Sequence, residues 1–366
     1  MNRTDTRSTA RRRTTRGRTS WLRAAVPALV AVSALVCGTV AAAPAAGVPD
    51  DGRVDAARIA KVNAALPTPL SDSFYKTPKN IAAYKQGQII STRSRPNPPA
   101  FVDVKTYQIK FRSNDSENKP IAAITTVLVP NRKKANGPLL SFQHIVNAVG
   151  LECAPSQVVW TQDPNLTIRE APALNVVLQQ GWTVSIPDHL GPRSAYGAAK
   201  LGGQISLDAI TATQNFTPAA VKHSKVGLAG YSGGGMATAW AAALAPKYTP
   251  DLNIVGAAYG GVPMDLIKMA EGLGYKRPQP ALGPAFAAAI GLAREYSDKV
   301  TIFDFLSTDG KRMFSEMRNA CTNDVLRIGA GHSARQVTKS GVQLFENKTF
   351  RKIGAENSLA MYPGVP

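Results

Sequence analysis

The chain has 366 residues, of which 44% are apolar and 18% are charged, a balance that excludes a disordered or fibrous protein and allows a large buried core. Its formal net charge is +19, and residues 1–45 contribute eight of the 43 Lys and Arg side chains. From residue 46 onward the charge is +12 and the basic side chains are scattered, with no basic patch interleaved with aromatic residues. This distribution excludes nucleic acid as a favoured partner.

The first 45 residues have the order of a secretory signal peptide. Residues 1–20 hold seven arginines, and the apolar stretch from Trp21 to Ala46 ends in "AAAPAAG". This pattern predicts a signal peptide over 1–45, cleavage after Ala45, and a secreted protein that is extracellular or associated with the cell envelope. A retained membrane anchor is the alternative for this run, which Pro27 interrupts. A third interpretation is that Cys37 is lipid-modified, which is disfavoured because "ALVC" lacks small residues before the cysteine.

Residues 46–100 are polar and dotted with prolines, which predicts an N-terminal arm lying over the body. In "TYQIKFRS", residues 106–113, apolar and polar side chains alternate as in a half-exposed strand. After the turn "SNDSENKP" comes the more apolar "IAAITTVLVP", residues 121–130. We predict that these two segments pair as antiparallel strands.

Four short apolar runs follow, separated by longer segments with helical patterns. The runs occupy residues 138–142, 182–187, 225–230 and 253–261. Continuous apolar strands that alternate with helices predict a parallel sheet covered on both faces. Residues 101–261 are therefore expected to form an α/β body.

From residue 262 to residue 323 the sequence becomes alanine-rich and amphipathic, with no run of comparable strand quality. Three helical segments in succession predict a helical cap, and the alternative is that they are further crossover helices of the body. Residues 324–366 are expected to return toward the body without completing it. Two cysteines remain after the signal segment, Cys153 and Cys321. In an exported protein such a pair forms a disulfide more often than a metal site, which needs more ligands at short spacing.

The segment "LAGYSGGGM" contains the pattern G-x-S-x-G, with Ser232 as its serine. A short apolar strand, Val226 to Ala229, leads into the pattern, and a helix-forming segment, Met236 to Leu244, leaves it. This is the context of a nucleophile elbow, in which glycines allow close backbone approach and the helix N-terminus faces developing negative charge. The Gly233 N–H is then one oxyanion donor. The alternatives are an ordinary tight turn or a phosphate-binding loop, and the latter lacks a lysine after the glycines.

Three segments resemble the secretory lipase (LIP) family: "NGPLLSFQHIVNAVGLECAPS", "IPDHLGPRSAYGAAKLGGQISLDAI" and "LAGYSGGGMATAWAAALAPKYTPDLNIVGAAYGGVPMDL". The resemblance implies an α/β-hydrolase fold with a helical cap after the nucleophile. It also implies hydrolysis of acylglycerols or other carboxylic esters, through an acyl-enzyme on Ser232, without a cofactor or metal. Lipid or ester substrates and transient contact with lipid interfaces would follow. The family places the second oxyanion donor at Asn147 or its neighbours, and its cysteine pattern implies a bridge between Cys153 and Cys321.

A serine nucleophile needs a base, and in this fold the acid and the histidine follow the serine along the chain. Three of the four histidines, His144, His189 and His223, precede Ser232. We expect His223 at the surface, at the far end of the nucleophile strand, while His189 could line the mouth of the site and His144 could contribute to the oxyanion region. Only His332 follows the serine.

Two acids, Asp309 and Asp324, lie between Ser232 and His332. Asp324 and His332 are too close in sequence for the intervening strand and helix of this fold, so we do not expect His332 to be the base. Family members continue with further strands that carry the triad acid and histidine. We therefore expect that the C-terminal strands are missing, that hydrolysis by this chain is weak or absent, and that a parallel-sheet edge is exposed. The alternative function is a truncated, catalytically impaired homologue that binds lipid or acyl chains.

Overall fold

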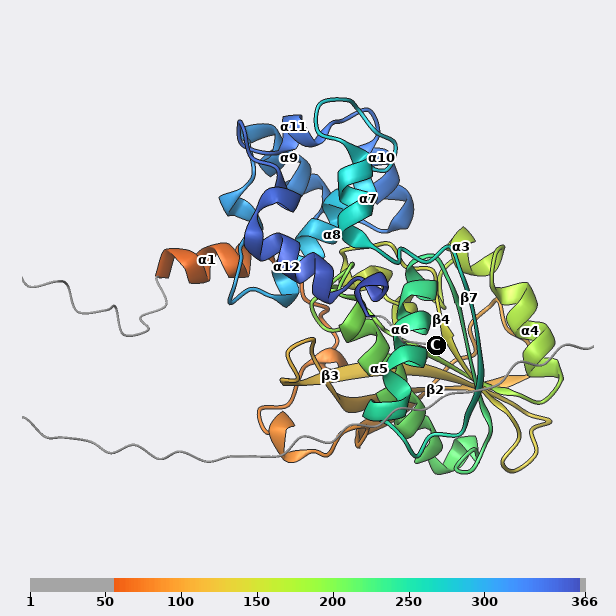
Figure 1. Ribbon diagram of the computed structural model, residues 1–366. Helices are drawn as coiled ribbons and strands as arrows, with labels where there is room; N and C mark the ends of the chain where they lie inside the picture. The colour runs from red at the N-terminus through yellow and green to blue at the C-terminus, as the bar shows by residue number, and fades with distance from the viewer. Residues whose placement is uncertain (1–55, 363–366) are drawn as a thin grey trace, which may run out of the picture. The chain divides into compact units, whose positions relative to one another are not determined.

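The computed structural model describes residues 56–362 (Figure 1). The signal segment over 1–45, its cleavage site and Cys37 lie outside the described residues. Within the described range, none of the helices combines the length and the apolar character needed to span a membrane.

A seven-stranded mixed sheet forms the body, in the order β1-β2-β3-β5-β4-β6-β7. Its first three strands and β5 pair antiparallel, and β5, β4, β6 and β7 pair parallel. The strands are β1 (Ile89–Arg95), β2 (Val104–Asn114), β3 (Pro120–Pro130), β4 (Leu139–Gln143), β5 (Thr183–Pro187), β6 (Val226–Tyr231) and β7 (Ile254–Gly260). The predicted antiparallel pair is confirmed as β2 and β3, and the four predicted parallel runs are β4 to β7. The prediction that residues 106–113 form a half-exposed strand is wrong, because Thr106, Gln108 and Lys110 on its polar side are buried as well. The arm predicted over 46–100 also supplies a strand, β1, which extends the sheet beside β2.

Twelve α-helices occur in the described chain. Those before β6 are α1 (Ala56–Ala65), α2 (Pro155–Val158), α3 (Pro164–Thr167), α4 (Ala171–Gln179) and α5 (Ala199–Gln214). Those after it are α6 (Gly233–Tyr248), α7 (Leu266–Leu273), α8 (Leu282–Glu295), α9 (Thr308–Met317), α10 (Thr322–Gly329), α11 (Ala334–Val337) and α12 (Lys348–Glu356). The helical patterns read between the strands correspond to α4, α5 and α6.

The two faces of the sheet bury different side chains, as the period-2 alternation of a strand requires. On β3, Val127 and Val129 belong to the large core cluster that includes Ile205 and Ile210 of α5. Leu128, between the two valines, belongs to a second cluster with α4. Helices therefore cover both faces over the centre of the sheet, as the apolar runs predicted.

The prediction that all four parallel strands are covered on both faces is wrong for β7. This strand is the last in the sheet, and most of its residues are exposed, with Val255 60% and Tyr259 43% accessible. No described segment pairs with its outer edge. The apolar run 253–261 correctly indicated a strand, but apolar character alone does not say which element covers it. The exposed parallel edge expected from the sequence is present at β7.

Helices α7 to α12 form the cap, which Figure 1 draws in colours from turquoise at α7 to dark blue at α12. Central to this group is α8, which packs on α10 and contributes Phe286 and Ile290 to the same core cluster as the sheet. Helices that begin after residue 323, α11 and α12, pack on the earlier cap helices α9 and α7. Cap and body thus share one continuous apolar core.

Candidate functional site

Ser232 stands on a sharp turn between β6 and α6. Its backbone has φ 54° and ψ −117°, a conformation that non-glycine residues rarely adopt. The Ser232 N–H donates to Gly260 O at 2.8 Å, and Ser232 O accepts from Met236 N–H at 2.8 Å. These bonds fix the strained residue between the neighbouring strand and the helix, and its side chain remains partly accessible.

Both glycines of the G-x-S-x-G pattern are required by close contacts. A Cβ on Gly230 would stand 2.5 Å from Thr238 Oγ1, and one on Gly234 would collide with the main-chain oxygen of Gln143 at the end of β4. Neither site has room for a side chain. The close backbone approach predicted from the sequence is therefore confirmed, and it brings the loop after β4 against the start of α6.

Free backbone donors surround Ser232 at the N-terminus of α6. Among the described residues, no acceptor is bonded to the N–H of Gly233 or of Gly234. These groups carry the positive end of the helix dipole, which favours a negative charge placed beside Ser232. The arrangement suits an oxyanion that forms on a substrate attached to Ser232.

Asn147 lies in the loop after β4 and packs directly against Gly233, so the structure brings the two predicted oxyanion residues together. Its main-chain N–H donates to Thr322 Oγ1 at 3.2 Å. The side-chain oxygen Oδ1 is buried without a partner in the described chain, and no acceptor there is bonded to Nδ2. The side-chain amide is thus the part of Asn147 that is still free to donate.

A buried polar cluster supports the start of this loop. The Glu170 carboxylate pairs with the His144 ring at Nδ1 and accepts the Ile145 N–H at 2.9 Å. The His189 ring donates from Nε2 to His144 O at 3.0 Å, and burial lowers the pKa of His189 to about 4. Both histidines are almost fully buried, so His189 does not line an open site mouth, and the His144 ring is engaged with Glu170.

Asp188 holds the segment that follows the loop. Its two oxygens accept from the N–H and the hydroxyl of Ser156, at 2.8 and 2.5 Å. Burial raises the pKa of Asp188 to about 7, although the bonds from Ser156 and the nearby His144 act in the opposite direction. The Ser156 oxygens in turn accept from Gln108 and Tyr75.

The loop is joined to the cap by covalent and hydrogen bonds. Cys153 and Cys321 form a disulfide with a Cα–Cα distance of 5.3 Å, which confirms the predicted bridge. The Val149 N–H donates to Ala320 O at 3.0 Å. A Cβ on Gly150 would collide with main-chain atoms of Asn319, so the two segments run in close contact. We refer to residues 147–153 and 318–322 together as the seam.

Arg294 of α8 donates hydrogen bonds to both sides of the seam. Arg294 is 1% exposed, and among the described residues its guanidinium donates only to main-chain oxygens and has no carboxylate partner. Burial lowers the pKa of Arg294 to about 9. Its acceptors are Ala65 O, Val149 O, Arg193 O, Ser194 O and Arg318 O. One side chain therefore ties both sides of the seam to α1 and to the loop before α5.

The remaining histidines lie elsewhere. His223 is exposed just before β6, at the end of that strand opposite Ser232, as expected. His332 lies between α10 and α11 in the cap, where its main-chain oxygen accepts from Gln279 N–H at 3.1 Å. Across residues 56–362, no histidine ring is hydrogen-bonded to Ser232. Asp309 and Asp324, the acids between Ser232 and His332, pair with Arg312 and Arg327 at the surface.

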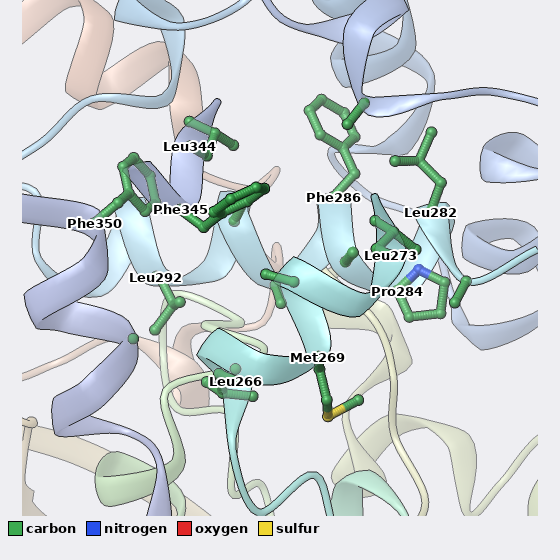
Figure 2. A pocket seen from close by; sticks show the side chains of 18 of the residues that line it. Leu266, Met269, Leu273, Leu282, Pro284, Phe286, Leu292, Leu344, Phe345 and Phe350 are labelled. Atoms are coloured by element: carbon green, nitrogen blue, oxygen red, sulfur yellow. The ribbon is translucent and has the colours of Figure 1, made fainter. Parts of the chain in front are cut away.

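An apolar cavity of about 230 Å³ lies within the cap and reaches the body at Met236, in the first turn of α6. Figure 2 shows its wall, built mainly from α7, α8 and the segment from Leu344 to α12. Its lining residues in the described part of the chain carry no charged side chain. The labelled side chains are Leu266, Met269, Leu273, Leu282, Pro284, Phe286, Leu292, Leu344, Phe345 and Phe350. Because Met236 is bonded to Ser232 through the main chain, the cavity and the elbow share the same helical turn.

Three contributors to this site were missed by the sequence reading: Thr322, Glu170 and Arg294. Each acts through partners far away in the chain, so no local spacing marks it. The position of Thr322 beside Cys321 was the one available signal, because the predicted bridge would bring that segment to the loop.

Comparison with known proteins places these features in context. The family model for secretory lipases matches residues 163–366. Lipase A of Moesziomyces aphidis is 34% identical over 262 residues, which are 70% of this chain and 56% of that protein. The secreted triacylglycerol lipase LIP3 of Malassezia restricta is 32% identical over 312 residues, 81% of this chain and 65% of that protein. This chain therefore spans little more than half to about two thirds of the length of these relatives.

Solved structures agree on the architecture. The closed state of Candida antarctica lipase A matches with a TM-score of 0.73 and 31% identity, covering 80% of this chain and 69% of that one. The rice cell wall degrading esterase LipA of Xanthomonas oryzae matches with a TM-score of 0.58 and 15% identity, covering 75% of this chain and 79% of that one. At this identity the match bears on the fold alone. The fold is that of the α/β-hydrolases, as the sequence predicted.

Proposed function

Because this chain belongs to the secretory lipase family, we propose that it hydrolyses carboxylic esters, acylglycerols among them, through an acyl-enzyme on Ser232. The observation that carries the proposal is the strained, partly accessible Ser232 at the N-terminus of α6, with free amide donors beside it. A strained serine at a strand-to-helix turn has no evident structural purpose, whereas it presents a nucleophile to a substrate.

In the proposed reaction, Ser232 Oγ attacks the carbonyl carbon of the ester while its proton passes to a base. The carbonyl oxygen becomes an oxyanion, which accepts from the N–H of Gly233 and from Nδ2 of Asn147. Collapse of this intermediate breaks the ester C–O bond and releases the alcohol, which takes up the proton. Water then attacks the acyl-enzyme and releases the acid. The Asn147 main-chain N–H is not assigned this role, because it is bonded to Thr322.

The cap cavity is the proposed acyl-chain site. Its uncharged, apolar wall favours a hydrocarbon chain over a charged group, and Met236 places one end of it near Ser232. We therefore expect esters of medium-length acids to bind better than acetates.

The proposed reaction needs a base beside Ser232. The described residues supply no histidine bonded to Ser232, and a serine without a base is a poor nucleophile. We accordingly expect slow turnover. The same observation favours a second candidate, a protein that binds acyl chains without hydrolysing their esters.

The purified full-length chain and a Ser232→Ala variant should be compared on p-nitrophenyl butyrate and octanoate. We expect slow hydrolysis that the substitution abolishes. Equal rates for the two proteins would reject the acyl-enzyme. Displacement of a fluorescent fatty acid by octanoate, without hydrolysis by either protein, would establish the second candidate. Robust hydrolysis that depends on Ser232 would contradict the expected lack of a base.

We also propose that the protein is exported and that it meets its lipid or ester substrates outside the cytoplasm. The support is the order of residues 1–45 and the relatives whose names describe secreted lipases. N-terminal sequencing of protein recovered from the medium should begin at Ala46. Recovery of an uncleaved N-terminus in the membrane fraction would favour the retained anchor.

A further inference from the structure

We propose that Thr322 is a positioning residue for the oxyanion site, an inference that rests on the proposed function. Its hydroxyl oxygen accepts the Asn147 N–H at 3.2 Å, although 175 residues separate the two in sequence. Thr322 is 8% exposed and is the first residue of α10, in the cap. A residue of the cap thus holds the residue that faces Gly233.

The backbone that carries Thr322 is itself well fixed. The residue before it, Cys321, is bridged to Cys153 at the far end of the seam. The helix that begins at Thr322 packs on α8, and Val325 in its first turn is fully buried. The backbone at Thr322 is therefore held by a covalent bond on one side and by core packing on the other.

This bond decides which part of Asn147 can meet an oxyanion. With its main-chain N–H committed to Thr322, Asn147 retains only Nδ2 as a free donor. Its Oδ1 is buried against Gly233 without a hydrogen bond, so the amide is held by its backbone and by contact instead of by bonds of its own. Loss of the Thr322 bond would leave the Asn147 backbone free to rotate and to move Nδ2.

The geometric demand on an oxyanion donor is strict, since donors must lie at hydrogen-bond distance from the position of the developing charge. A displacement of about 1 Å costs up to about a hundredfold in rate. The seam therefore does more than attach the cap: through Thr322 it sets the position of a group that acts on the substrate.

The test uses a matched pair of substitutions in the full-length chain. Thr322→Val keeps the shape and removes the acceptor, whereas Thr322→Ser keeps the acceptor. We expect Thr322→Val to lower kcat for p-nitrophenyl butyrate about tenfold with KM unchanged, and Thr322→Ser to stay within about twofold of wild type. Wild-type kcat in Thr322→Val, or equal losses in both variants, would overturn the proposal.

Hydrogen exchange at the Asn147 amide, followed by NMR, separates this inference from the proposed function. Absence of Ser232-dependent hydrolysis in the wild type would reject the proposed function, and amide exchange would then decide the role of Thr322. Faster exchange in Thr322→Val that Thr322→Ser restores supports the positioning bond. Unchanged exchange in Thr322→Val removes it. Melting temperatures within a few degrees of wild type exclude general unfolding as the cause.

Discussion

The side-chain oxygen of Asn147 lies only 2.3 Å from the position that a Cβ atom on Gly233 would take. Val146 O is also close, 3.1 Å from that position. The loop after β4 and the residue that follows Ser232 are therefore in direct contact, with no side chain between them. This contact places the two proposed oxyanion donors, Asn147 and Gly233, next to each other beside Ser232.

Gly233→Ala should push the Asn147 amide away from Ser232. We expect ester hydrolysis to fall about a hundredfold, as for the loss of one oxyanion donor, with a melting temperature within a few degrees of wild type. Steady-state kinetics and thermal unfolding check this. Gly256→Ala is the matched control, because a Cβ at Gly256 meets nothing within 4 Å. Equal activity in both variants would remove Asn147 from the oxyanion site.

The strain at Ser232 should be measurable as stability. Its φ and ψ are close to the mirror image of extended backbone, which glycine adopts readily and alanine does not. We expect Ser232→Gly to exceed Ser232→Ala by about 1 kcal/mol in unfolding free energy. At Ser315, exposed within α9, the order should reverse, because glycine destabilises a helix. The same order at both positions in urea titrations would argue that Ser232 is unstrained.

Asp188 should make stability fall as pH rises. Its folded pKa of about 7 exceeds the unfolded value of 3.8, so the folded state binds the proton more tightly between these limits. The stabilisation is complete below about pH 4 and is lost as pH rises through 7. Between pH 5 and pH 8, the unfolding free energy of Asp188→Asn should thus rise by about 1 to 3 kcal/mol relative to that of the wild type, as measured by urea unfolding. A difference that does not change with pH would show that Asp188 is ionised throughout. Burial lowers the pKa of His189, so His189 makes stability rise with pH. This contribution is present in both the wild type and Asp188→Asn, and it cancels in the difference between them.

Filling the cap cavity should change the preference for acyl chains. Ala289 lines the cavity from α8, and a phenylalanine there would occupy part of its volume. We expect Ala289→Phe to lower kcat/KM for p-nitrophenyl octanoate about tenfold and to leave the acetate ester within about twofold. Ala60→Phe, on the exposed side of α1, is the control. Parallel losses on both esters would place the acyl chain elsewhere.

Local patterns were sufficient to predict the elements around Ser232. The alternation in 106–113, the apolar run 225–230 and the glycines beside Ser232 each report a local backbone requirement, and each corresponds to an observed strand or turn. Periodicity also indicated the first cap helices, because amphipathic faces repeat within one helix. The sequence therefore predicted the elbow and the layers around it.

Long-range partnerships could not be predicted in this way. The charge of Arg294 favours an exposed surface, and only the fold shows that five main-chain oxygens surround its guanidinium. The pairing of His144 with Glu170 likewise depends on where α4 begins relative to β4. For β7 the apolar run predicted burial, although burial depends on a neighbour that the strand's own residues do not specify.

The disulfide of the seam also determines what happens when the chain is cut. Cys153 and Cys321 are 168 residues apart, and the segment between them carries β5, β6, the elbow and much of the cap. A protease that cleaves one peptide bond inside this segment leaves two pieces that remain linked through the cystine. Such a nicked molecule would migrate as one band on a non-reducing gel and as two after reduction. In a medium that contains proteases, the bridge would thus keep Ser232 covalently attached to both halves of its surroundings after a single cut.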